Sequence, residues 1–197
     1  MNMTQLNELL LQSLEHEKGG IQVYETALKC VVNPDLRQEW EKYLQETREH
    51  VRVLNDVFAN LKLDPYQETP GRQVVRYLGA SLVQAMQMAL TSAPPEAAQL
   101  VACECVVNAE TKDHLDWELI GKCADKLSGD AHQLLMDAYL KVEDQEDEHV
   151  YHSKGWCREL WIESLGLKAI LPPPEEVQHV TNAMEAAEAE QSAPATR

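Results

Sequence analysis

Apolar residues recur every three to four positions along most of the chain, the spacing that lines one face of an α-helix. The pattern is broken at Asn33-Pro34, at residues 64–71, at Pro94-Pro95, at Ser128-Gly129 and from Gly166 to Pro174. Alternating apolar and polar residues, typical of strands, do not form a run of any length. The pattern therefore predicts an all-α protein with long helices at 4–32, 34–62, 72–92, 95–127 and 130–165.

Ionisable residues interrupt the apolar seam near the middle of four of these helices. They are Glu17 in the first helix, His50 in the second, Glu110 in the fourth, and Glu146 with His149 in the fifth. An unpaired charge in a protein core is costly, so it must be neutralised, paired or bound to a metal. Four such interruptions indicate one shared buried site.

These residues are expected to lie at the same position along the bundle axis. Helices joined by a short turn run antiparallel, so residues equally far from the turn lie level. Glu17 and His50 are equally far from Asn33-Pro34, and Glu110 and Glu146 are within one residue of level about Ser128-Gly129. The 72–92 helix, about 33 Å long, could carry the chain from one end of the bundle to the other. We therefore expect an antiparallel four-helix bundle with one long crossover helix.

Carboxylates and imidazoles in this layer would suit a pair of metal ions. Glu46 lies four residues before His50 on the same helix face and adds a fourth carboxylate. Four carboxylates balance two divalent cations, and mixed carboxylate and imidazole ligation suits iron or manganese. The predicted ligands are Glu17, Glu46, His50, Glu110, Glu146 and His149.

Three segments resemble known ferritin-like proteins. Glu17-Lys-Gly-Gly-Ile-Gln-Val-Tyr24 looks like the first-helix segment of bacterioferritin-type proteins, and Glu146-Asp-Glu-His149 looks like their fourth-helix Glu-x-x-His. The stretch Leu44–Leu54 is similar to a small bacterial ferritin-like family associated with stress. The resemblance covers about residues 10–165 and implies the ferritin-like superfamily, which includes rubrerythrins. It implies a di-iron or di-manganese oxidoreductase that reacts with dioxygen or peroxide in metal handling or oxidative stress.

The chain departs from the family pattern at Thr47, where the family has a Glu three residues before the second-helix histidine. Glu46 or Glu143 could substitute as a ligand, or one of the two metals could bind poorly. The alternative function is a non-enzymatic helical interaction protein with a vestigial or single-metal site. Four further residues are expected around the ligands, namely Tyr24, Thr47, Trp117 and His152; for Tyr24 and Trp117, simple core packing is the competing interpretation.

Composition limits the partners. The formal net charge of −16 disfavours nucleic acid and anionic membrane surfaces. The N-terminus has no signal-peptide pattern, and the five cysteines fit no disulfide framework, so we expect reduced thiols and a cytoplasmic location. We expect a monomer or homodimer rather than an iron-storing cage. Residues 1–166 are expected to form the bundle domain, followed at 167–197 by a Pro-rich break and an acidic tail with a disordered end.

Overall fold

The structure is a computed structural model that describes residues 1–178 and 180–192. It is all-α, as the sequence predicts, and the described residues contain no strand. None of the described helices is both long and apolar enough to cross a bilayer. The helices are α1 Met3–Cys30, α2 Pro34–Leu61, α3 Pro70–Ser92, α4 Pro95–Ala124, α5 Gly129–Ser164, α6 Pro174–Val177 and α7 Ala183–Ser192.

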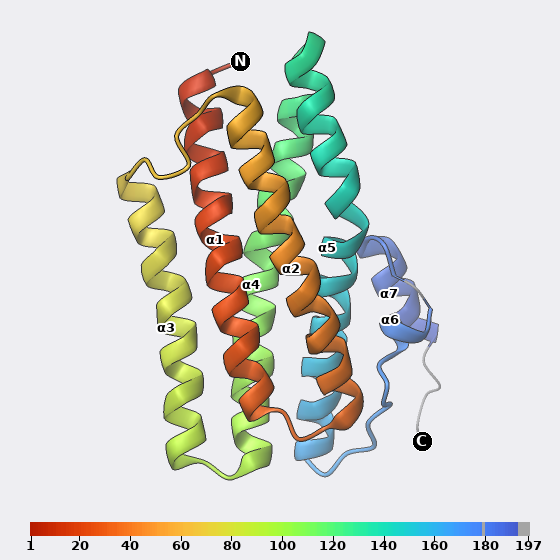
Figure 1. Cartoon of the computed structure of the whole chain (residues 1–197). Helices are drawn as coiled ribbons and strands as arrows, with labels where there is room; N and C mark the ends of the chain where they lie inside the picture. The colour runs from red at the N-terminus through yellow and green to blue at the C-terminus, as the bar shows by residue number, and fades with distance from the viewer. Residues whose placement is uncertain (179, 193–197) are drawn as a thin grey trace.

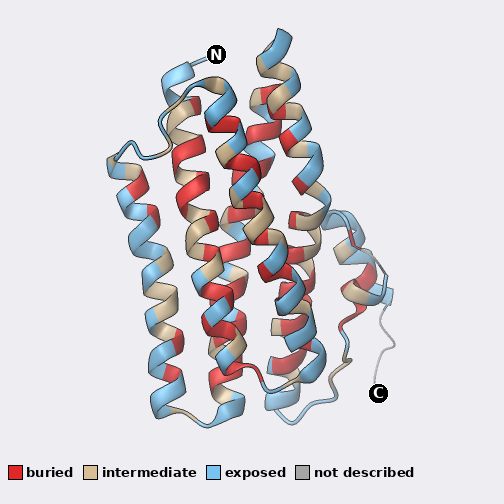
Figure 2. Ribbon diagram, viewed as in Figure 1, coloured by how far each residue is buried: buried red, intermediate tan, exposed pale blue. Residues whose placement is uncertain are grey.

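The five long helices lie side by side and alternate in direction along the chain (Figure 1). α1 contacts α2, α3 and α4, while α5 contacts α4 and α2. Helices α1, α2, α4 and α5 therefore surround a common interior, where the buried residues gather (Figure 2). α3 packs outside α1 and α4 and returns the chain from the end of α2 to the start of α4 (Figure 1).

The turn between α1 and α2 is fixed by side chains. Asn33 caps α2 by accepting the N–H groups of Asp35 and Leu36, and Pro34 occupies the first turn. The N–H groups of Val32 and Asn33 donate to Oε1 of Gln99 on α4. Because these donors bond outside α1, the helix ends at Cys30 rather than at the expected residue 32.

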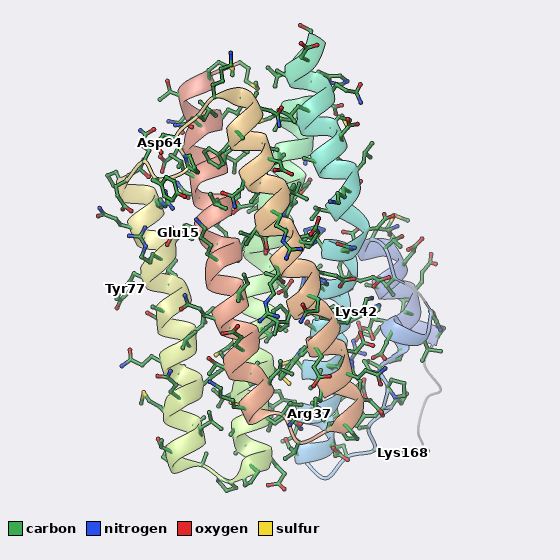
Figure 3. All side chains as sticks on the ribbon, in the orientation of Figure 1. Glu15, Arg37, Lys42, Asp64, Tyr77 and Lys168 are labelled. Atoms are coloured by element: carbon green, nitrogen blue, oxygen red, sulfur yellow. The ribbon has the colours of Figure 1, made fainter. Side chains whose placement is uncertain are left out.

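The start of α3 differs from the sequence prediction by two residues. Pro70 and Gly71, which were expected to lie in a break, form its first turn, since Thr69 caps the N–H of Arg72 and proline is well tolerated there. Arg72 and Arg76 of α3 donate to Glu15 of α1 at 2.7 and 2.6 Å. Glu15 lies between the two helices in Figure 3, so this ion-pair cluster fastens α3 to α1.

The interior consists of two hydrophobic clusters. One includes Leu10, Leu14 and Phe58 with neighbours from α4 and α5. The other includes Trp40, with neighbours from all five long helices, and Trp156. The ionisable residues that interrupt the seams belong to neither cluster, although they are buried. A polar layer therefore separates two apolar halves of one core.

The segment after α5 packs against that helix through α6. Glu175 is buried and accepts from Nη2 of Arg158 at 2.9 Å. A Cβ at Gly155 would come within 2.7 Å of the same carboxylate, so a glycine is needed at this close approach. A disordered end was predicted for the 167–197 tail without exact bounds, and the last five residues, 193–197, lie outside the described residues.

Candidate metal centre

Five of the predicted ligands converge in the polar layer. Glu17, His50 and Glu146 form one group that could hold a metal ion, and Glu110, Glu146 and His149 form another. Within each group the ligand atoms all lie within 4.8 Å of one another. All five residues are buried, with at most 3% of their surface exposed.

Glu146 belongs to both groups and lies between the two histidines. Its Oε1 is 3.0 Å from Nδ1 of His50 and 3.6 Å from Nδ1 of His149. Nδ1 of His50 also lies 3.4 Å from Oε1 of Glu17, and Nδ1 of His149 lies 3.3 Å from Oε2 of Glu110. The arrangement is two adjacent ligand sets that share one carboxylate.

Both histidines present the same nitrogen to the centre. Nε2 of His50 is 2.8 Å from Oε1 of Gln145, and Nε2 of His149 is 2.9 Å from Oε2 of Glu46. An acceptor at Nε2 favours the tautomer that carries its proton there and leaves the Nδ1 lone pair free for a metal. Glu46, predicted as a ligand, instead lies on the far side of His149 and belongs to neither of the two groups that could hold a metal ion.

Two aromatic residues predicted around the ligands lie near carboxylates of the centre. Nε1 of Trp117 donates to Oε1 of Glu17 at 2.7 Å, which fixes the orientation of that carboxylate. Burial and the nearby Glu110 carboxylate raise the pKa of Tyr24 well above its ordinary value, so Tyr24 stays a neutral phenol. Both residues are also fully buried, so they fill the core as well.

The protonation of the centre reflects competition between burial and pairing. Burial favours neutral histidines, but Glu110 and Glu46 outweigh it and raise the pKa of His149 to about 9. Burial is likewise outweighed at His50, where Glu17 and Glu146 raise the pKa. Burial raises the pKa of Glu146. Without a cation, the layer therefore retains protons that a metal ion would displace.

Unsatisfied polar atoms test whether a metal fits. Within the described part of the chain, buried atoms of all five residues lack a hydrogen-bond partner. A buried group left without a partner costs about 1–3 kcal/mol. The atoms are carboxylate oxygens and imidazole nitrogens, which are ligands for iron and manganese, and the donor set therefore fits two such ions. The atoms are Glu17 Oε2, His50 Nδ1, Glu110 Oε2, both oxygens of Glu146, and His149 Nδ1.

The other predicted residues lie near the centre but outside the ligand sets. The hydroxyl of Thr47 donates to the carbonyl of Tyr43, and its methyl group faces Gly20 across the α1–α2 contact. Glu143 is hydrogen bonded to the hydroxyl of Tyr139. Nδ1 of His152 lies 2.8 Å from the hydroxyl of Tyr43, whose ring packs on His149 with centroids 4.2 Å apart.

Sequence reasoning missed two polar residues at the centre. Asp113 is 4% exposed, and burial together with the Glu146, Glu17 and Glu110 carboxylates raises its pKa well above the ordinary value. Asp113 lies three residues after Glu110 and four before Trp117, so all three share one face of the helix. This spacing could have predicted that Asp113 faces the centre. Gln145 had no such signal, because its role depends on where His50 lies across the α2–α5 contact.

Comparison with protein families, with curated proteins and with solved structures finds no match to this chain. The functional argument therefore depends on the geometry of the centre.

Proposed function

We propose that the chain is a ferritin-like four-helix bundle that binds two divalent metal ions, iron or manganese, and uses them in redox chemistry with dioxygen or peroxide. Glu17 and His50 would hold one ion, Glu110 and His149 the other, and Glu146 would bridge them. Bound iron or manganese would supply the electron transfer to the oxidant. The centre lies in a core layer between two apolar clusters, which would keep bulk water away.

The remaining side chains would orient the ligands. Gln145 and Glu46 hold the histidines with Nδ1 toward the centre, and Trp117 holds Glu17. Three carboxylates in the two groups leave two divalent cations with one positive charge to balance. The Glu46 carboxylate, 2.9 Å from His149, lies close enough to contribute that charge through the local field.

A single observation supports this proposal most strongly. Five buried acidic and imidazole side chains from four helices direct ligand atoms that make no hydrogen bond within the described residues at one small volume. Some of these atoms lie close together, such as His50 Nδ1 and Glu146 Oε1 at 3.0 Å, yet none of them makes a hydrogen bond within the described residues. A cation would satisfy several of them at once, which ion pairs between the side chains leave undone.

Metal content of protein purified without chelator tests the proposal. We expect about two equivalents of iron or manganese per chain. Glu17→Ala and Glu110→Ala should each lose about one equivalent, while Glu146→Ala should lose both because its carboxylate is shared. Glu163→Ala, at an exposed position on α5, is the control. Metal content unaffected by all three substitutions at the centre would contradict the ligand assignment.

Thr47 favours a second candidate, a helical interaction protein with a single-metal or vestigial site. Its hydroxyl is occupied by a backbone carbonyl, so α2 contributes only His50 to the metal-binding groups. Turnover separates the candidates: fully metal-loaded protein that consumes neither dioxygen nor peroxide favours the interaction protein. Cycling of the metal with either oxidant favours the redox protein.

A further inference from the structure

A small pocket opens between α4 and α5 beside the proposed metal centre. Glu146 and Trp117 line its inner end, and Asp147 and Glu118 line it further out. Exposure of the acidic side chains increases along the pocket, from 2% at Glu146 to 15% at Asp147 and 46% at Glu118. The pocket therefore connects the protein surface with the carboxylate that both ligand sets share.

The wall of the pocket is acidic and held in place by specific contacts. Glu143 is hydrogen bonded to Tyr139, and Oδ1 of Asp147 lies 2.7 Å from Nε2 of His114. The ring of Tyr139 lies so close to α4 that a Cβ at Gly121 would be 2.8 Å from it. Acidic side chains in a narrow cleft concentrate cations, because the protein walls focus the field.

The inner end of the pocket offers an independent indication of a ligand. Glu146 is 1% exposed, lines the pocket, and has no hydrogen-bond partner for either carboxylate oxygen among the described residues. A buried carboxylate whose oxygens accept no hydrogen bond, at the end of an acidic cleft, is an acceptor for a cation arriving through that cleft.

We propose that this pocket is the uptake route for divalent cations, with Glu143 and Asp147 as an outer binding station that passes the ion to Glu146. This inference rests on the proposed two-metal function. The outer carboxylates would hold the cation while it still keeps part of its water shell, and Glu146 would then draw it into the dry layer.

Rapid mixing of metal-free protein with Co²⁺ tests the route, because cobalt absorbance changes when water ligands are exchanged for protein ligands. In Glu143→Gln/Asp147→Asn, we expect the rate of uptake to fall about tenfold and to depend less on ionic strength, since part of the focusing field is lost. The equilibrium Co²⁺ content should stay at the wild-type value, because the inner ligands are unchanged.

The matched control is Asp137→Asn/Asp144→Asn, which removes the same charge from exposed positions on α5 outside the pocket. Its uptake rate should stay within about twofold of wild type, because charges exposed to solvent outside the pocket are screened by salt. The single variants Glu143→Gln and Asp147→Asn should show intermediate rates, and they remain informative if the double variant is unstable. A double variant that takes up Co²⁺ as fast as the control would overturn the route alone. Wild-type protein that binds no Co²⁺ would overturn the proposed function together with the route.

Discussion

At the scale of single residues, the orientation of each histidine matters as much as its presence. His50 and His149 both direct Nε2 at an oxygen acceptor and Nδ1 at the centre. Partners that fix a ligand's far nitrogen are worth about 10–100-fold in metal affinity. We therefore expect Glu46 to affect metal affinity as the hydrogen-bond partner of His149 and not as a ligand.

Glu46→Gln should weaken metal binding without abolishing it. An amide is a poorer acceptor than a carboxylate for the Nε2 proton, so we expect affinity to fall about tenfold or more. Stoichiometry at saturating metal should remain that of wild type. Competition titration with a chelator measures the affinity, and Glu41→Gln on the exposed face of α2 is the matched control. Loss of one full equivalent in Glu46→Gln would instead show that Glu46 is a ligand.

At the scale of elements, α3 is attached differently from the other long helices. It buries few residues, and the buried Arg72 is paired with the carboxylate of Glu15 on α1. Arg72 also donates to the carbonyls of Pro65 and Gln67, which ties the loop before α3 to the same cluster. Polar contacts thus supplement a modest apolar interface.

Removing Glu15 should destabilise the protein strongly. Glu15→Ala leaves the Arg72 guanidinium buried without its carboxylate, which typically costs about 3 kcal/mol or more. Glu68→Ala removes an exposed partner of Arg76 and should cost much less, because solvent screens an exposed ion pair. Urea unfolding of the two variants gives the comparison. Equal losses would mean that burial of Arg72 does not determine the strength of the α1–α3 contact.

The attachment of α6 should depend on pH. Burial, followed by the Glu39 carboxylate, raises the pKa of Glu176 to about 7; Asp35 acts in the same direction, and Trp156 and Lys42 oppose it. Because the folded-state pKa exceeds the ordinary value of 4.5, the stabilising contribution of the neutral acid is fully present below pH 4.5. It is lost as pH rises through about 7.

Amide hydrogen exchange in α6, corrected for its intrinsic pH dependence, measures this effect. Protection should decrease between pH 5 and 8 in the wild-type protein. Glu176→Gln should flatten that dependence, because a neutral amide replaces the titrating group, and Glu188→Gln at an exposed position on α7 should not. A pH profile unchanged in Glu176→Gln would rule out this carboxylate as the cause.

At the scale of the whole molecule, the polar layer that contains the five predicted ligands divides one core into two apolar halves. Without metal, the layer contributes several buried polar atoms that have no partner in the described residues. A bound cation would satisfy atoms from four helices at once. Metal binding should therefore stabilise the entire structure rather than one helix pair.

Thermal unfolding tests this coupling. At free metal concentrations about 100 times the dissociation constant, two sites should add about 5 kcal/mol. For a chain of this size, that corresponds to a rise in Tm of about 10 °C or more. Mn²⁺ avoids oxidation during the scan, and EDTA should reverse the shift. An equal rise in Glu146→Gln would show that the stabilising ion binds elsewhere.

Sequence alone determined the helices and the depth of the polar layer. Helical periodicity is a local property, and a charge that breaks an apolar seam marks its own height along the axis. Glu17, His50, Glu110, Glu146 and His149 were predicted together for this reason, and the structure brings them together. Asp113 was predictable in principle from the same spacing.

Only the tertiary structure decided which side of each imidazole faces the centre, and hence that Glu46 and Gln145 orient the histidines. It also decided that the hydroxyl of Thr47 is bonded to its own helix and that an acidic pocket reaches Glu146. These features depend on the rotation of neighbouring helices about their axes. That rotation is set by packing across the whole core, which a pattern along one helix does not specify.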